Sequence, residues 1–172
     1  MKTNYDKVLE VFFDNPTEKF YIREIARLTK LNPNTILNIT EQLVKEDLIK
    51  REKKKHIVEF SANTGEKFKN SKRSYNFSKI FINELIDVLD KKFSPDAISV
   101  IGSYSRGEDI EDSDIDIVVI SKKEYENISV EKYEKELNRK IHLIVVNYNK
   151  MPDEFYTNLI NGIILRGYIK KK

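Results

Sequence analysis

The sequence predicts an α+β protein made of two parts, a small helical part that ends in a hairpin and a second part built on a mixed sheet. Apolar residues recur at helical spacing three times within the first 45 residues, and two short alternating segments follow. Farther along, "AISVI" and "DIDIVVI" have the apolar character of buried strands. A chain of 172 residues has room for two such small domains.

The composition favours a folded protein without disulfides. Apolar residues make up 40% of the chain and charged residues 34%, which argues against wholesale disorder. The absence of cysteine excludes a disulfide framework and a thiolate zinc site. No segment is long and apolar enough for a membrane span, and the first residues lack the apolar core of a signal peptide. We therefore expect a cytoplasmic protein with no membrane partner.

The positive charge of the chain is concentrated in its first part. Residues 1–72 contain 15 Lys and Arg against 11 Asp and Glu, a net charge of +4. The remainder has 31 − 15 = 16 against 28 − 11 = 17, a net charge of −1. This asymmetry is a mild indication of a polyanionic partner for the first part.

The first part reads as three helices and a hairpin. The first helical pattern stops at Asn15-Pro16, and a second short helix covers residues 22–28. For the third helix, Asn32 is the expected N-cap and Pro33 the first helical residue. The strands "DLIKRE" and "HIVEFSA" follow, joined by a basic tip of Lys53, Lys54 and Lys55.

This order of elements resembles the winged helix-turn-helix family of DNA-binding domains. Asp47 stands where that family often has glycine, and aspartate tolerates the left-handed conformation. The resemblance implies double-stranded DNA as a partner, read by the helix that starts near Asn34, with residues 53–56 as the wing. The expected DNA-binding residues are Asn34, Thr35, Asn38 and Gln42 for bases and Lys53, Lys54 and Lys55 for phosphates. The alternative is a dimerisation module with a solvated basic tip, and a homodimer fits either reading.

Between the two parts, residues 63–79 are polar and have no sustained period. We place the domain boundary in this segment, with a winged helix-turn-helix domain in residues 1–72 and a second domain in residues 73–172. Residues 78–93, "SKIFINELIDVLDKKF", then predict one helix that packs on the sheet of the second domain.

Two aspartates stand at the head of the second apolar strand. Because side chains alternate along a strand, Asp114 and Asp116 are expected on one face, where two carboxylates repel unless a cation lies between them. Hard oxygen ligands favour Mg²⁺, which takes phosphate oxygens as further ligands. Gly102 permits close backbone approach after the first strand, and residues 103–107 are expected to form a short helix with its N–H groups toward an anion.

These residues resemble the nucleotidyltransferase superfamily with the polymerase-beta-like fold, especially its minimal prokaryotic members. Gly102, Ser103, Asp114 and Asp116 match its signature, and "NLINGIILRGY" is similar to its closing segment. The resemblance implies transfer of a nucleotidyl group from a nucleoside triphosphate to a hydroxyl acceptor, with Mg²⁺ held by both aspartates. It further implies that Gly102 and Ser103 cradle the triphosphate, with Arg106 as a further phosphate partner.

One departure from the family pattern leaves a second reading open. Members commonly carry a third carboxylate on a later strand, where this chain has His142. An imidazole there can accept a proton, so the candidate catalytic residues are Asp114, Asp116 and His142. Alternatively, His142 is an ordinary strand histidine and the aspartates lie in a solvated turn. The rival function is a transcriptional regulator or antitoxin-type protein with a degenerate nucleotidyltransferase domain. Such a domain would sense nucleotides or bind a partner such as a HEPN-type toxin, which some members modify with AMP.

Overall fold

The computed structural model describes residues 2–123 and 128–170. The chain divides into two compact units, Met1–Lys72 and Arg73–Lys172. The division lies within helix α4 (Glu66–Ile82), in the segment where the sequence analysis placed the boundary. Each unit is described by itself.

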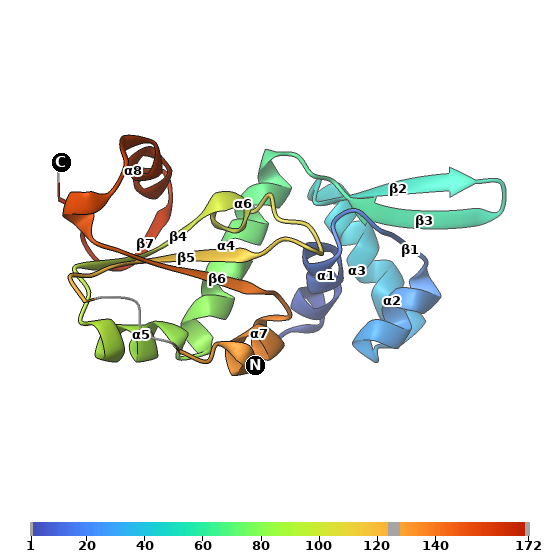
Figure 1. Cartoon of the computed structure of the whole chain (residues 1–172). Helices are drawn as coiled ribbons and strands as arrows, with labels where there is room; N and C mark the ends of the chain where they lie inside the picture. Colours follow the sequence, from blue (N-terminus) through green and yellow to red (C-terminus); the bar gives the residue numbers. More distant parts are fainter. Residues whose placement is uncertain (1, 124–127, 171–172) are drawn as a thin grey trace. The chain divides into compact units, whose positions relative to one another are not determined.

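In its described residues, the first unit contains three whole helices, the beginning of α4 and a three-stranded antiparallel sheet (Figure 1). The strand order is β1-β3-β2, so the short strand β1 extends the predicted hairpin by a third strand that the sequence analysis missed. The elements are α1 (Asn4–Asp14), β1 (Lys19–Phe20), α2 (Ile22–Thr29), α3 (Pro33–Lys45), β2 (Ile49–Lys54) and β3 (Ile57–Ala62).

Local chemistry sets the limits of these elements. The side chain of Asn32 accepts a hydrogen bond from the Asn34 N–H at 2.9 Å and caps α3, and Pro33 takes the first helical position, as predicted. Asp47 has φ = 62°, the left-handed conformation predicted for it. The buried apolar residues of the three helices and the sheet include Val8, Phe12, Ile25, Ile36, Leu43, Ile49 and Phe60.

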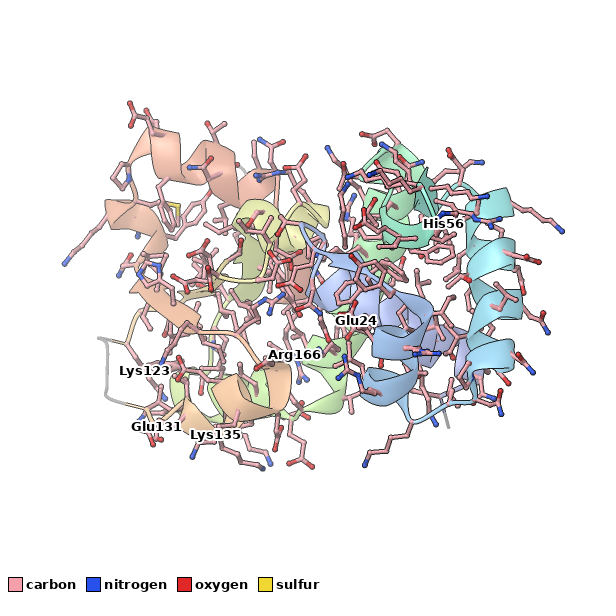
Figure 2. All side chains as sticks on the ribbon, turned by 90° about the vertical axis from the view of Figure 1, so that its right-hand side faces the viewer. Glu24, His56, Lys123, Glu131, Lys135 and Arg166 are labelled. Carbon is pink, nitrogen blue, oxygen red and sulfur yellow. The ribbon has the colours of Figure 1, made fainter. Side chains whose placement is uncertain are left out.

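The tip of the hairpin differs from the prediction. Lys53 and Lys54 belong to β2, where they pair with Val58 and Ile57, so the basic residues do not all lie in the turn. The turn itself consists of Lys55, with φ = 54°, and His56, which Figure 2 labels. The hairpin is longer than expected because the pairing of β2 with β3 continues through Lys53 and Lys54.

The segment in which the domain boundary was expected, residues 63–79, is largely helical. Helix α4 buries four positions spaced four residues apart, Phe68, Lys72, Asn76 and Ile80. Because two of the four are polar, the apolar period that marks a helix is hidden in the sequence. The helix predicted over residues 78–93 is also wrong: it is broken at Glu84, with φ = 62°, into α4 and α5 (Leu85–Phe93).

The second unit is built on a four-stranded mixed sheet, as predicted, with the order β6-β5-β4-β7. Strands β5 and β6 are parallel, whereas β4 is antiparallel to both of its neighbours. The strands are β4 (Ala97–Ile101), β5 (Ile115–Ile120), β6 (Ile141–Val146) and β7 (Ile163–Gly167). The remaining helices are α6 (Gly102–Arg106), α7 (Glu131–Leu137), η1 (Tyr148–Lys150) and α8 (Asp153–Ile160).

Helices cover both faces of this sheet (Figure 1). Alternate residues of β5, such as Ile115 and Ile117, pack with α5 and α7, whereas Val118 and Ile120 pack with Leu159 of α8. A strand whose two faces are both buried is apolar throughout, which explains the unbroken run at the end of β5. Within the described residues, no helix has the length and hydropathy needed to cross a membrane.

Candidate functional site

The candidate site begins where β4 ends and the chain turns into α6. Gly102 has φ = +74°, a conformation that L side chains rarely adopt. A Cβ atom placed on Gly102 would lie 2.7 Å from Oδ2 of Asp116, closer than real Cβ atoms approach any atom. Glycine is therefore required at this position both by the backbone and by the carboxylate that lies against it.

Asp116 lies at the centre of this arrangement. It is the second residue of β5, in register with Ile101 of β4 and with His142 of β6. Nδ1 of His142 lies 3.0 Å from Oδ1 of Asp116, a hydrogen-bonding distance. The Asp116 side chain is 33% exposed and that of His142 is 64% exposed, so both are open to a ligand. The structure thus brings together Gly102, Asp116 and His142, all three predicted from the sequence.

Asp114 is placed differently from Asp116. It precedes β5, is exposed, and lines an open hollow of about 580 Å³. Glu131 and Lys135, which project from α7 in Figure 2, line the same hollow. Across residues 2–123 and 128–170, no three His, Asp or Glu side chains form a cluster that could hold a metal ion by themselves.

The two remaining predicted nucleotide-binding residues lie in α6. Ser103 is half-buried, and its hydroxyl forms no hydrogen bond with any residue that the structure describes. Arg106 is exposed, and its Nε donates to Oε2 of Glu108 at 2.8 Å. Ser103 is therefore available to a ligand directly, whereas Arg106 would have to leave a neighbouring carboxylate.

Sequence reasoning missed Asp109, a buried carboxylate in the loop between α6 and β5. It accepts a hydrogen bond from Asn76 and lies near Arg139. No signal in the sequence distinguishes it from the acidic residues around it, since Glu108 and Asp112 in the same loop are exposed. Its role can be read only from its contacts.

The exposed side of α3 carries most of the predicted base-contacting residues. Asn34, Asn38 and Gln42 are exposed, whereas Thr35 is half-buried. The Gln42 side-chain amide donates to Glu46 at 2.9 Å. Leu37 lies on the same helix with 41% of its surface exposed, an apolar residue that the sequence analysis left out.

The lysines of the hairpin between β2 and β3 differ in their partners. Nζ of Lys54 lies 3.7 Å from Oε2 of Glu59, and Nζ of Lys19 lies 2.7 Å from Oε2 of Glu52. The hydrogen bond between Lys19 and Glu52 raises the pKa of the lysine and lowers the pKa of the glutamate. Lys53 is exposed and forms no ion pair among the described residues, as is also the case for Lys55. The charge of Lys54 is thus partly compensated within the hairpin.

Comparison with known protein families finds a match for the second unit. The family model described as "Nucleotidyltransferase domain" matches residues 82–168, a range that includes every candidate residue of the second unit. No curated protein and no solved structure matches the chain. The match agrees with the mixed sheet and does not extend to the first unit.

Proposed function

Since the chain belongs to the nucleotidyltransferase domain family, we propose that its second unit transfers a nucleoside monophosphate from a nucleoside triphosphate to a hydroxyl acceptor. Membership of the family points to nucleotidyl transfer in general. The specific reaction, the metal and the residues proposed for it rest on the contacts around Gly102.

The observation that carries the proposal is the position of the Asp116 carboxylate over Gly102, where a Cβ would meet its oxygen at 2.7 Å. This leaves a carboxylate beside the half-buried backbone of Gly102, one residue before Ser103. Backbone and hydroxyl groups bind phosphate oxygens, but a bare carboxylate repels them. A cation between the carboxylate and the phosphate would make the arrangement favourable.

The residues present fit Mg²⁺. Asp114 and Asp116 offer hard carboxylate oxygens, and among the described residues no group of three acidic or histidine side chains is placed to hold a metal ion without further ligands. Mg²⁺ commonly binds through one or two carboxylates and retains places for water and substrate phosphate. When bound, it would neutralise charge at the α-phosphate and on the leaving pyrophosphate.

The residues of the chain itself have separate roles in this proposal. His142 holds the Asp116 carboxylate in place through the 3.0 Å contact. Gly102 and Ser103 orient the triphosphate, and Arg106 approaches it after leaving Glu108. The acceptor oxygen forms its bond to the α-phosphorus as the bond to pyrophosphate breaks, and the proton of the hydroxyl passes to the exposed imidazole of His142 or to water.

Transfer is tested by incubating the protein with radiolabelled nucleoside triphosphates, magnesium and candidate protein or nucleic-acid acceptors. His142→Ala is expected to retain magnesium-dependent triphosphate binding within about threefold but to lower the transfer rate on the order of 100-fold, the usual range for loss of a general base. His142→Asp is expected to retain more activity than His142→Ala. Equal transfer rates in wild type and His142→Ala would show that His142 takes no part in the transfer step.

A second candidate function rests on one observation. His142 is paired in register with Asp116, at the position where the family commonly has a further carboxylate. A domain that has lost turnover would bind nucleotide and regulate DNA binding or a partner protein, as an antitoxin does. In that case the wild-type protein binds triphosphate but transfers no nucleotidyl group to any acceptor, and His142→Asp gains transfer activity.

We further propose that the first unit is a winged helix-turn-helix that binds double-stranded DNA. The order of three helices and a hairpin supports this, as do the exposed amides of α3 and the exposed wing lysines. Asn34 and Asn38 would contact base edges, since asparagine forms paired hydrogen bonds with adenine. Lys53 and Lys55 would contact phosphates, and Leu37 would contact a thymine methyl group.

Replacing Lys53, Lys54 and Lys55 together by alanine is expected to weaken binding to all duplexes and to flatten its salt dependence. The slope of log K against log salt should fall by about 0.9 for each lost phosphate contact. We expect a change of about 2 from Lys53 and Lys55, because Lys54 is already paired with Glu59. Gel-shift titrations over a range of salt concentrations measure this slope.

The matched control replaces Lys122, Lys132 and Lys135, three exposed lysines of the second unit, and should leave the slope unchanged. Asn38→Ala should alter the sequence preference without altering the slope. If the intact protein binds neither random nor genomic duplexes at low salt, the DNA proposal fails.

A further inference from the structure

Asp109 is a buried carboxylate in the loop that joins α6 to β5. Its side chain is 1% exposed, although Glu108 and Ile110 on either side are exposed. Burying a carboxylate is unfavourable unless hydrogen bonds and an opposite charge compensate for the lost water. The partners of Asp109 therefore identify what the loop is held against.

The first partner is Asn76, a buried residue of α4. Its Nδ2 donates to Oδ1 of Asp109 at 2.7 Å and to the main-chain oxygen of Tyr104 in α6 at 3.0 Å. The Tyr104 hydroxyl donates in return to the Asn76 main-chain oxygen at 3.4 Å. One buried amide thus ties both the loop and the helix that begins at Gly102 to the same point on α4.

The second partner is Arg139, whose side chain is 5% exposed and whose Nη2 lies 3.9 Å from Oδ2 of Asp109. The next residue, Lys140, accepts a hydrogen bond at its main-chain oxygen from the N–H of Ile115 at 2.8 Å. Ile115 is the first residue of β5. The loop is therefore held to α4 through Asp109 and to the segment that leads into β6 through Asp109 and Ile115.

From these contacts we infer that Asn76 and Asp109 are positioning residues for the nucleotide site. Asp109 lies seven residues after Gly102 and seven before Asp116, midway between the two groups that must face the same triphosphate. The network fixes the loop and with it the approach of Asp116 to Gly102. The claim that the site binds a nucleotide rests on the proposed function, whereas the claim that the network fixes the loop does not. A displacement of about 1 Å at such a site can cost on the order of 100-fold in rate.

The fixing of the loop is tested by hydrogen exchange on the full chain without nucleotide. Asp109→Asn preserves the shape and an acceptor oxygen for Asn76 but removes the charge that faces Arg139. We expect amides 107–116 to exchange at least about tenfold faster, while those of β4 and α5 are unchanged. Asp112→Asn makes the same chemical change at an exposed position of the same loop and should change nothing. Unchanged exchange in Asp109→Asn, or a uniform increase across the sheet, would overturn the inference.

Calorimetric titration with ATP and magnesium supplies the second measurement. Asp109→Asn should bind about tenfold more weakly than wild type, and Asp112→Asn equally well. If wild type binds no common triphosphate, the proposed function fails, and the exchange rates still decide whether the loop is positioned. Should Asp109→Asn not fold, Asn76→Ala removes the bridging amide without changing any charge and is judged by the same measurements. Loss of the whole fold in both variants would refute a positioning role, because the network would then hold the unit rather than the loop.

Discussion

The double substitution Asp114→Asn and Asp116→Asn is expected to abolish magnesium-dependent triphosphate binding while leaving the fold intact. The affinity should fall at least about 100-fold, equivalent to about 2.7 kcal/mol, because amides do not supply the negative charge that attracts a divalent cation. Calorimetric titration of both proteins with ATP, with and without magnesium, measures the loss. The common triphosphates other than ATP should be titrated in the same way.

From the sequence, these two carboxylates are expected to repel each other, and the double substitution would remove that repulsion. Asp114 is exposed, so water weakens this repulsion, and the amide introduced in place of the Asp116 carboxylate can still bond to His142. We therefore expect the melting temperature without metal to change by less than about 4 °C, in either direction. Asp112→Asn is the matched control and should bind as wild type does. Equal affinity in wild type and the double variant would refute the assignment of the site.

Gly102→Ala is expected to destabilise the second unit by about 1–3 kcal/mol and to weaken triphosphate binding at least about tenfold. Alanine would have to adopt φ = +74°, and its Cβ would lie 2.7 Å from the Asp116 oxygen. Either the backbone or the carboxylate must move, and each movement changes the same site. Thermal unfolding and the titration described above measure the two effects separately.

Gly65→Ala provides the control for a change from glycine to alanine in itself. The nearest atom to a Cβ on Gly65 is Oδ1 of Asn63 at 4.0 Å, and its backbone lies outside the left-handed region. This variant should differ from wild type by no more than about 0.5 kcal/mol. If Gly102→Ala is as stable as wild type and binds triphosphate equally well, the close approach of Asp116 to Gly102 has no consequence.

Much of the fold could be predicted because local signals were sufficient. Asn32 and Pro33 mark the start of α3 by their own chemistry, and the apolar residues of β4 and β5 mark strands buried on both faces. Helix α4 could not be recognised, because Lys72 and Asn76 take buried positions that a pattern search expects to be apolar. What compensates a buried polar group lies far away in the chain, and periodicity carries no information about it.

Some residues of the candidate site also have local signals in the sequence, and others do not. Gly102 and Asp116 were predicted from their places at the end of one apolar strand and the start of the next, and the resemblance to the nucleotidyltransferase superfamily implied that they share a site. The pairing of His142 with Asp116 depends on the register of β5 against β6, which spacing alone leaves open by one or two residues. Asp109 has no local signal, since its burial follows from Asn76, 33 residues earlier in the chain.

The strand order of the second unit also bears on how the protein is made. Strand β4 lies between β5 and β7, and β7 ends 167 − 101 = 66 residues after β4 does. At a synthesis rate of about 5–20 residues per second, one edge of β4 lacks its partner for roughly 3–13 s. In the first unit the central strand β3 is the last of the three in sequence, so both of its neighbours are already made when it appears. During this interval of translation, the unpaired edge of β4 is therefore open to misassembly and to capture by chaperones.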